Sequence, residues 1–383
     1  MPVKIALEGL VLNTNLGQPV LYEITTKGEK YFPSQLETGH SFMLWFLLPP
    51  SDKPQKREFL FRLEEFPGSL PGTTKVNLKK DEKDLSMVCQ DKPILNYRYA
   101  ITYPPAGIDP LYKRSGFIHP LWSPGGTVLT QIQPPDHYHH YGIWGPWTLT
   151  HIEGREVDFW NLAKGQGTVN FSQFLSETEG NIYSGFQALQ QHMDFGAPGE
   201  DQVALNEILD VRVWNVGDNI RIIDYTTTLN TPLENGILLD AYRYGGGLGF
   251  RATERWHKDN CTVLTSENKT RPEADGTNAR WCIVEGESDS GEGRSGILFL
   301  SHPANRMHPE PMRVLPLDAS DGRGDMFFEF TPIRHQEWKL EPGQGYTLKY
   351  RMIVFDGLMN RELAEEYWRN FAEGVRVEVI REN

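Results

Sequence analysis

The chain has 383 residues, which is enough for one large domain with a smaller companion. Its 51 acidic residues outnumber its 38 basic residues, and the net charge of −13 disfavours binding to nucleic acid or to an anionic membrane surface. The three cysteines, Cys89, Cys261 and Cys282, are far apart in the sequence and provide neither a disulfide framework nor the C-x-x-C spacing of a metal site.

The first residues predict a small β-domain of their own. Residues 1–15, MPVKIALEGLVLNTN, alternate apolar and polar side chains as a strand does, and they lack the long apolar region of a secretory signal. The segment 66–77, FPGSLPGTTKVN, has the composition of a linker. We therefore expect a small N-terminal β-sandwich domain over residues 1–75 and a main domain over residues 76–383.

The N-terminal region also indicates whether the protein crosses a membrane. The most apolar run, FMLWFLL at 42–48, is much shorter than the roughly 20 residues that cross a bilayer. We expect no membrane span, and a cytoplasmic location, or a periplasmic location if a signal peptide has been removed from the chain.

Short β-type segments separated by glycine and proline fill most of the remaining length. The segments ILDVRVWNV (208–216) and IRIIDYTTTL (220–229) flank Gly-Asp-Asn and predict a hairpin of long strands. A second pair of strands is predicted from residues 325–331 and 346–355. So many antiparallel strands, with so few helices, must bury their apolar faces against another sheet, which predicts an all-β antiparallel sandwich.

Helical periodicity is confined to the C-terminal end. Asn360 can cap a helix in which Leu363, Tyr367 and Phe371 recur every four residues, and Gly374 can end it. We expect this helix to pack on the outside of a sheet.

The segment 134–145, PPDHYHHYGIWG, contains three of the chain's 11 histidines. Because proline favours extended backbone, we expect His137 and His139 on one side of the segment and His140 on the other. Imidazole changes charge near neutral pH and suits proton transfer, and the neighbouring Asp136 can select its tautomer.

Three interpretations of this cluster stay open: proton transfer, metal binding, or hydrogen-bonded histidines within a protein core. A metal ion needs three or four ligands, so His137 and His139 would require partners from elsewhere in the chain. The candidate partners are His119, His302 and His308. The last two belong to SHPANRMHP, which follows an apolar strand at a position where loop residues often form sites.

Aromatic residues surround the histidines in the sequence. Flat apolar faces with polar tips suit sugar rings, and we select Trp144 and Trp160 as binding residues, with ordinary core packing as the alternative. Asp158 lies in an apolar setting and needs a partner, either an arginine or a ligand hydroxyl.

Residues 242–251, YRYGGGLGFR, include three consecutive glycines that allow the backbone to approach a ligand closely. They lack the helix context that a dinucleotide site requires. Arg243, with Tyr244 beside it, can hold a carboxylate or polarise a carbonyl, and the alternative is an ordinary ion pair with a nearby acid. The sequence contains no GxSxG, Walker A, HExxH or zinc-finger motif, which disfavours those classes.

Several motifs together resemble those of the bacterial PmoA family. They are GFIHPLWSPGG (116–126), PDHYHHYG (135–142), DFW (158–160), ARW (279–281), HPAN (302–305), YR (350–351) and the N-terminal PVKIALEG and PSQLE. The similarity covers nearly the whole chain, and H-x-H-H-x-G is its most specific element. The resemblance implies a supersandwich like that of galactose mutarotase and a role in bacterial carbohydrate catabolism. The methane-oxygenase label of that family would require a membrane-embedded subunit, which this sequence does not resemble.

The fold resemblance also implies a catalytic glutamate. In mutarotase-like proteins this residue lies on a late strand before an L-x-P-G turn, and here FEF (328–330) precedes LEPG (340–343), so that Glu329 matches. Its aromatic neighbours favour a buried carboxyl with a raised pKa that serves as a base, and the alternative is a solvent-facing glutamate.

We therefore expect an enzyme that transfers a proton at a sugar or keto-sugar carbon, as an epimerase, mutarotase, lyase or hydratase does. Glu329 would move the proton, His137 or His140 would be the partner acid, and Arg243 would stabilise oxyanion charge. The expected substrate-binding residues are His119, Trp144, Asp158, Trp160, Tyr244, His302 and His308. The alternatives are a non-catalytic carbohydrate-binding protein and a histidine-ligated metal enzyme, so the expected cofactor is none or a divalent metal, and the expected partner is a small-molecule carbohydrate.

Overall fold

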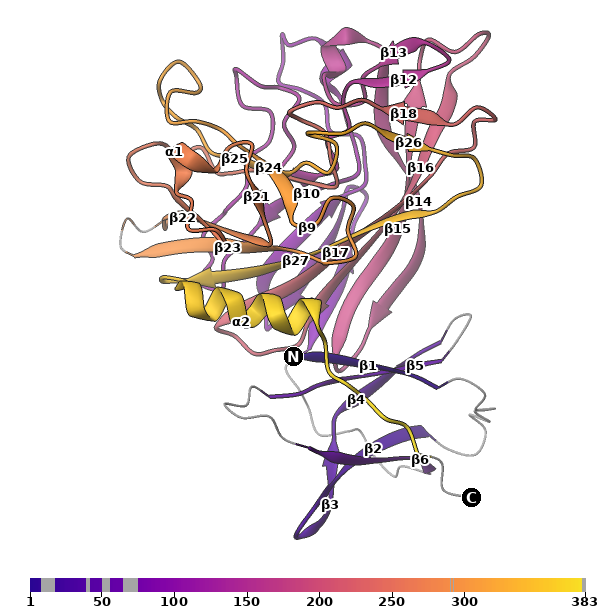
Figure 1. Cartoon of the computed structure of the whole chain (residues 1–383), viewed down its shortest axis with the longest axis vertical. Coiled ribbons are helices and arrows are strands. Elements are labelled where there is room, and N and C mark those ends of the chain that lie inside the picture. Colours follow the sequence, from indigo (N-terminus) through magenta and orange to yellow (C-terminus); the bar gives the residue numbers. More distant parts are fainter. Residues whose placement is uncertain are drawn as a thin grey trace.

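The computed structural model describes residues 1–7, 18–38, 42–49, 56–64, 75–289, 291 and 293–380. Within these residues the chain is almost entirely antiparallel β-structure, built mainly from two large sheets (Figure 1). The prediction of an all-β antiparallel sandwich with a C-terminal helix is confirmed.

In the described ranges, one large sheet has nine strands and the other has eight. The nine-stranded sheet has the order β21 (Asn278–Ala279), β24 (Glu310–Val314), β25 (Phe327–Phe330), β19 (Leu248–Arg251), β11 (Ile143–Trp144), β10 (Phe117–Leu121), β9 (Lys92–Arg98), β8 (Asp84–Cys89) and β7 (Val76–Lys80). The eight-stranded sheet has the order β14 (Gly167–Glu179), β15 (Tyr183–Asp194), β16 (Gln202–Trp214), β17 (Ile220–Asn230), β27 (Tyr346–Asp356), β23 (Arg294–Ser301), β22 (Trp281–Glu287) and β20 (Thr262–Thr265).

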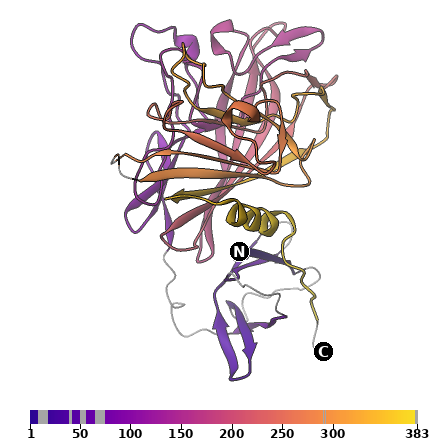
Figure 2. The same ribbon diagram turned by 60° about the vertical axis from the view of Figure 1, so that its left-hand side comes forward.

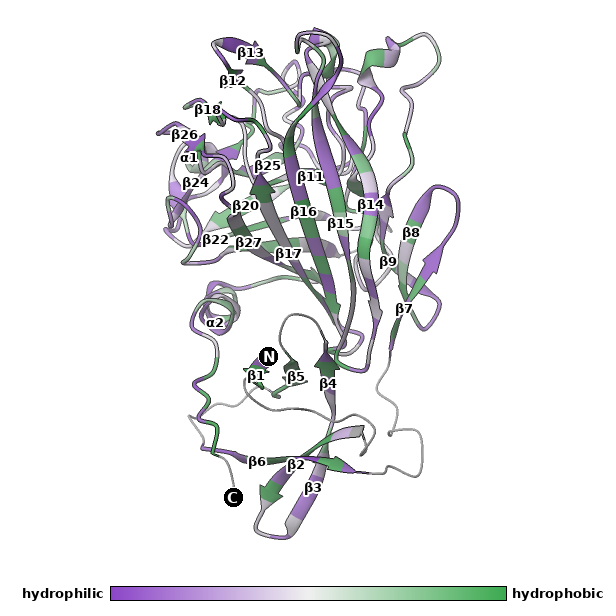
Figure 3. Cartoon of the chain, turned by 90° about the vertical axis from the view of Figure 1, so that its right-hand side faces the viewer, coloured by the Kyte–Doolittle hydropathy of each residue, from purple (hydrophilic) through white to green (hydrophobic). Residues whose placement is uncertain are grey.

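Smaller elements complete the main domain. A four-stranded sheet has the order β13 (Arg155–Val157), β12 (Thr150–Ile152), β18 (Ile237–Leu239) and β26 (Trp338–Leu340). Two 3₁₀ turns span Pro110–Tyr112 and Leu162–Lys164, and the short helix α1 spans Arg271–Ala274. The long strands of the eight-stranded sheet alternate in hydropathy, as Figure 3 shows along β16.

The core lies between the two large sheets. Phe328 of β25 stacks on Phe299 of β23 with ring centroids 4.7 Å apart, and Phe330 stacks on Tyr350 of β27 at 5.6 Å. Because side chains alternate along a strand, Phe327 points to the opposite face of the nine-stranded sheet. That outer face carries the candidate site.

One predicted pair of strands is confirmed and the other is wrong. β16 and β17 form the expected hairpin, with Trp214 opposite Ile222. β25 and β27, which cover the second predicted pair, belong to different sheets, because the chain between them forms β26 of the four-stranded sheet. Local turn signals therefore identified the strands but not their partners.

Helix α2 (Arg361–Ala372) covers the outer face of the eight-stranded sheet, as predicted. Its cap is confirmed, because Asn360 Oδ1 accepts a 2.8 Å hydrogen bond from the backbone N–H of Leu363. Tyr367 and Phe371 pack against the sheet, as their spacing predicted. Leu363 is 39% exposed, so the prediction that it shares the buried face of the helix was wrong. Gly374 follows the helix with a φ of +64°, a backbone angle that favours glycine.

The N-terminal strands form two further sheets beneath the main domain (Figure 2). One has the order β1 (Pro2–Ala6), β5 (Met43–Leu47) and β4 (Ser34–Glu37), and the other has the order β3 (Gly28–Phe32), β2 (Gln18–Thr25) and β6 (Glu58–Glu64). Their apolar faces share one small core that includes Val3, Leu21 and Phe46. Most of the predicted linker at 66–77 lies outside the described residues, and β7 begins at Val76.

The N-terminal unit contacts the main domain. Arg212 of β16 forms an ion pair with Glu37 at 2.9 Å, and Gln35 accepts hydrogen bonds from the backbone of the loop before β15. After α2 the chain runs back past the N-terminal sheets (Figure 1), where Val375 packs against their core. In the described part of the chain, no helix is both long enough and apolar enough to cross a membrane.

Candidate functional site

The three clustered histidines lie in a loop of two consecutive turns. The His137 N–H donates to the Pro134 carbonyl at 2.8 Å, and the His140 N–H donates to the His137 carbonyl at 3.0 Å. Adjacent prolines begin a turn as readily as they extend a chain, so the expected alternation of the imidazoles was wrong. All three rings instead pack together, with centroids 4.7 Å apart for His137 and His140 and for His139 and His140. We call His137, His139 and His140 the imidazole cluster.

Aromatic side chains pack against the buried side of the imidazole cluster. His140 stacks on Trp160 and Phe327, with ring centroids 5.6 and 5.1 Å away, and lies 5.7 Å from Trp144. Trp144 and Trp160 are only 1% and 3% exposed. The expectation that these two indoles present their faces to a sugar was therefore wrong, because imidazole and phenyl rings already cover them.

Burial and nearby positive charge keep two of the imidazoles neutral. Burial, followed by the charge of His137, lowers the pKa of His139 to about 4. Burial, followed by the charges of His139 and Arg251, lowers the pKa of the nearly inaccessible His140 well below its usual value. His140 Nδ1 has no hydrogen-bond partner among the described residues. These rings are proton acceptors at neutral pH.

A buried ion pair lies beside the imidazole cluster. Arg251 of β19 is 1% exposed and donates from Nη2 to Asp325 Oδ2 at 2.5 Å, while its Nε and Nη1 have no partner in the part of the chain that the structure describes. Arg271 of α1 holds the loop that carries Asp325, by donating to the carbonyls of Leu315 (3.1 Å) and Gly324 (2.7 Å). The buried charge of Arg251 is thus only partly satisfied by the protein.

Glu329 lies on the same face of the nine-stranded sheet as Phe327, between Gly249 of β19 and Arg313 of β24. It is fully buried; Oε1 accepts a 2.7 Å hydrogen bond from the Gly245 N–H, and Oε2 has no partner in the described ranges. Burial raises its pKa well above the usual value, and two nearby arginines offset only part of this rise. The expected burial and raised pKa are found, and the role of this carboxyl as a base stays a prediction.

The three glycines before β19 do not approach a ligand. Gly245 adopts a φ of +113°, which lets its N–H reach Glu329. A Cβ at Gly246 would lie 2.5 Å from the Phe330 carbonyl oxygen, and a Cβ at Gly247 would clash with the Tyr350 hydroxyl. The absence of side chains therefore lets the backbone pack on β25 and β27.

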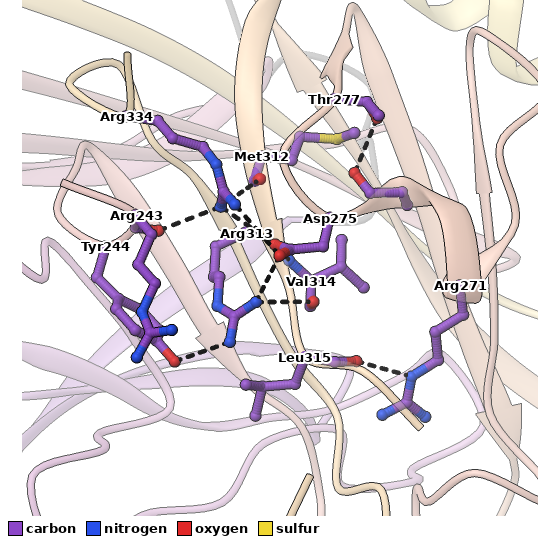
Figure 4. Close-up of polar contacts among 11 residues, drawn as sticks. Arg243, Tyr244, Arg271, Asp275, Thr277, Met312, Arg313, Val314, Leu315 and Arg334 are labelled. Carbon is purple, nitrogen blue, oxygen red and sulfur yellow. Dashed lines mark hydrogen bonds and ion pairs between the residues drawn. The ribbon is translucent and has the colours of Figure 1, made fainter. Parts of the chain in front are cut away.

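Three arginines gather around Tyr244 and Asp275 (Figure 4). Arg313 Nη2 donates to the Tyr244 hydroxyl at 3.0 Å, and Arg313 Nη1 pairs with Asp275 Oδ2 at 2.7 Å. Arg334 pairs with Asp275 Oδ1 at 3.1 Å, and the exposed Arg243 places its guanidinium 5.3 Å from the centre of the Tyr244 ring. We call Arg243, Arg313 and Arg334 the arginine cluster. The Tyr244 ring also lies 5.0 Å from Trp160, so it links the two clusters.

Two predicted site residues have structural partners near the imidazole cluster. His119 shares a 2.9 Å hydrogen bond between Nδ1 and Thr130 Oγ1, and burial together with Arg98 lowers its pKa to about 4. Asp158 accepts hydrogen bonds from the backbone N–H groups of Trp160 and Asn161 and pairs with Lys164 at 3.0 Å. Its partner is therefore a lysine and its own loop, not the arginine or ligand that we expected.

His302 and His308 lie on the opposite side of the sandwich, under α2. The His302 ring packs on Phe371 at 5.2 Å, and the His308 ring stacks on Trp368 at 6.0 Å. The expectation that these histidines join the imidazole cluster was wrong, because β23 carries the loop that contains them to the other sheet. Within the described residues, no three His, Cys, Asp or Glu side chains are arranged to hold a metal ion.

Sequence reasoning missed several residues of this face. They are Arg251, Asp275, Arg313, Phe327 and Arg334. Arg313, within the apolar strand EPMRV, carried a usable signal, because a charge in a buried strand needs a nearby partner. An open groove of about 500 Å³ at the four-stranded sheet was also missed; it is lined by His151, Glu153, Gly154, Asn235, Gly236, Leu238, Asp240 and Lys339.

Comparison with known proteins gives a family but no activity. Residues 84–369 match the model described as "Family of unknown function (DUF6807)". No curated protein matches the chain. Among solved structures, it is similar to heparan sulfate lyase HepC from Pedobacter heparinus, with 8% identity and a TM-score of 0.31 over 76% of this chain and 36% of that one.

A second solved structure is as distant. The GH36 alpha-galactosidase AgaA from Geobacillus stearothermophilus has 9% identity and a TM-score of 0.29 over 75% of this chain and 40% of that one. The chain thus spans well under half the length of either protein. Similarity this low says nothing about the activity of the chain.

Proposed function

The chain belongs to the DUF6807 family, and from the geometry of its own residues we propose that it transfers a proton on a carbohydrate. The observation that carries the proposal is the imidazole cluster, which lies on the same face of one sheet as a buried carboxyl with a raised pKa and the arginine cluster. Proton acceptors, a proton donor and cations that stabilise an oxyanion are the groups that epimerases, mutarotases, lyases and hydratases need. The motif similarity to the PmoA family supports a carbohydrate substrate.

The proposal assigns contact with the sugar to His137 and His139. Both keep exposed surface, and His139 is neutral at neutral pH. His137 Nδ1 lies 3.2 Å from Asp136 Oδ2, a contact that can orient the ring. His137 is therefore the proposed proton carrier and His139 the proposed acceptor.

Glu329 and His140 are more deeply buried than His137 and His139. His140 is 2% exposed and touches both other imidazoles, so its proposed role is to position them. Burial raises the pKa of Glu329, and its Oε2 has no partner in the described ranges, so we assign to it the role of a proton reserve behind the arginine cluster. Arg243, the exposed member of that cluster, is the proposed stabiliser of oxyanion charge.

The test measures turnover of a panel of aldoses, uronates and keto-sugars in D₂O. Proton NMR follows anomer exchange and deuterium incorporation, and mass spectrometry detects gain or loss of water. We expect His139→Gln to lower the rate about 10²–10⁴-fold, the usual contribution of one acid–base group. The matched control is His335→Gln, an exposed histidine on another loop, which should react at the wild-type rate.

The outcomes separate two classes of protein. Turnover that His139→Gln leaves unchanged would contradict the proposed roles. Binding of a sugar without any turnover would instead identify a carbohydrate-binding protein.

A further inference from the structure

The arginine cluster carries more positive charge than its protein partners neutralise. Asp275 pairs with both Arg313 and Arg334, at 2.7 and 3.1 Å. Arg243 is exposed and has no ion-pair partner in the described part of the chain. Three guanidinium groups, which stay charged at any physiological pH, thus face one carboxylate. This excess of positive charge is confined to the arginine cluster, whereas the whole chain has a net charge of −13.

The geometry concentrates this charge at one aromatic ring. The guanidinium groups of Arg243 and Arg313 lie 5.3 and 4.8 Å from the centre of the Tyr244 ring (Figure 4). Arg313 is 7% exposed, and its buried Nε has no hydrogen-bond partner among the residues that the structure describes. A buried N–H without a partner costs free energy, so such a group commonly serves a ligand or an ordered water.

Glu329 lies opposite Arg313 on the neighbouring strand but makes no ion pair with it among the described residues. Its burial raises the pKa of the carboxyl, which disfavours a negative charge at this position. The ion pairs with Asp275 are therefore the ones that offset the positive charge of the arginine cluster in the described ranges.

The position of the cluster connects it to the proposed active site. Tyr244 touches Trp160 at 5.0 Å and Phe327 at 6.2 Å, and these two rings support His140. A ligand that contacts Arg243 and Tyr244 would thus extend toward the imidazole cluster.

We propose that the arginine cluster binds the carboxylate of an acidic sugar, so that the substrate class is a uronic acid or a glycoside of one. This inference rests on the proposed function, since it names the substrate of the same face. Planar guanidinium groups match a carboxylate in shape and bond to it through two parallel N–H groups. Arg243 is the contact residue, and Arg313 with Tyr244 forms the floor beneath it.

The experiment compares ligands that differ in one charge. Isothermal titration calorimetry measures the binding of D-galacturonate, its neutral methyl ester, D-galactose and inorganic sulfate to the whole chain. We expect galacturonate to bind at least about tenfold more tightly than the ester or galactose, since a charge-assisted hydrogen bond contributes this much. D-Glucuronate with D-glucose repeats the comparison on a second sugar.

Substitutions of single arginines test which residue provides the positive charge that binds the carboxylate. Arg243→Gln should remove the preference for the acid, and Arg243→Lys should restore only part of it, because lysine keeps the charge but not the planar fork. Arg369→Gln is the matched control, since Arg369 is exposed on α2 and its loss changes the net charge equally. It should bind galacturonate as the wild type does.

The results for the two proposals can be told apart. Equal affinity for galacturonate and its ester, or wild-type affinity in Arg243→Gln, would overturn this inference even if a neutral sugar is turned over. Equal binding of sulfate and galacturonate would overturn it too, as that indicates a site for any small anion. Selective uronate binding without turnover would support the inference and contradict the proposed function.

Discussion

Two regions of the molecule use histidine in different ways. On the outer face of the nine-stranded sheet, the imidazole cluster has an unpartnered ring nitrogen and lies beside a partly satisfied arginine. Under α2, His302 and His308 each accept or share a hydrogen bond within their own loop and are covered by an aromatic ring of the helix. The comparison indicates that incomplete hydrogen bonding, and not the presence of imidazole, marks the candidate site.

Two buried carboxyls of the nine-stranded sheet show the same contrast. Glu310 begins β24 and is buried like Glu329, but it accepts hydrogen bonds from Ser301, from Asn305 at 2.9 Å and from Tyr350 at 2.8 Å. Glu329 accepts one hydrogen bond and leaves Oε2 free of any partner in the described ranges. A buried group with all its bonds made stabilises the fold, whereas one with bonds unmade reduces stability and is available to a ligand.

Breaking an ion pair in each region should have the largest effect. Asp325→Ala leaves Arg251 charged and buried, and we expect it to lower the free energy of unfolding by about 3–5 kcal/mol. Glu365→Ala breaks the partly exposed ion pair of Arg280 with α2 and removes the acceptor of the Trp281 indole N–H, so it should cost less, about 1–2 kcal/mol. Urea unfolding of both variants checks the contrast, and equal losses would contradict it.

Removing one aromatic ring from each region comes next. Phe327 is fully buried and contacts His140, Trp144, Trp160 and Tyr244, so Phe327→Ala should cost about 3–4 kcal/mol through the cavity it leaves. Phe371→Ala removes a partly exposed ring of α2 and should cost about half as much. Thermal and urea unfolding measure both, and a larger loss for Phe371→Ala would show that α2 is the more tightly packed region.

Two buried groups of the main domain, Glu310 and His139, should change the stability of the fold with pH in opposite directions. Burial raises the pKa of Glu310 to about 7, above its usual 4.5, so the folded state holds the proton more tightly than the unfolded state. The resulting stability is present below pH 4.5 and is lost as pH rises to about 7, by roughly 3 kcal/mol. Glu310→Gln should lack this loss when unfolding is measured at pH 5 and pH 8. A variant that loses as much stability as the wild type would show that Glu310 is already ionised.

The sequence predicted the fold class because alternating polarity and turn residues are local properties. It failed for β25 and β27, which belong to different sheets, since the partner of a strand depends on contacts between distant residues. It also identified the histidine-rich segment as a candidate site from composition alone. The packing of three imidazoles depends on two turns of the backbone. Side chains alternate between two faces in a strand but not in a turn, so the sequence could not predict this packing.

The arginine cluster illustrates what local patterns leave out. Arg243 was selected from its own segment, but its neighbours Asp275, Arg313 and Arg334 lie 32, 70 and 91 positions further along the chain. Glu329 was selected through a resemblance and is buried as expected, yet its proton affinity depends on those same distant arginines and on Gly245. The sequence thus identified single residues of the candidate site. It could not show which distant residues surround them, and so it could not show how their charges offset one another.

The smallest predicted effect concerns the pH response of the imidazole cluster. Burial and His137 lower the pKa of His139 from 6.5 to about 4, so below pH 6.5 the unfolded chain takes up a proton that the folded chain refuses. Stability should therefore fall as pH drops from 6.5 toward 4, by roughly 2 kcal/mol between pH 7.5 and pH 5. His139→Gln removes this loss, and its urea midpoint should fall less than that of the wild type over the same interval.

The control for that measurement is again His335→Gln, at an exposed position, which should follow the wild type. If His139→Gln also followed the wild type, the folded chain would protonate His139 as readily as the unfolded chain does. The ring would then be open to water, and the imidazole cluster would resemble a solvated surface more than the desolvated acceptor that proton transfer requires. Because Glu310 acts in the opposite sense over an overlapping interval, the double variant Glu310→Gln/His139→Gln should lack both contributions. Its stability should still fall toward pH 5, since His119, His140 and His302 also have lowered pKa values.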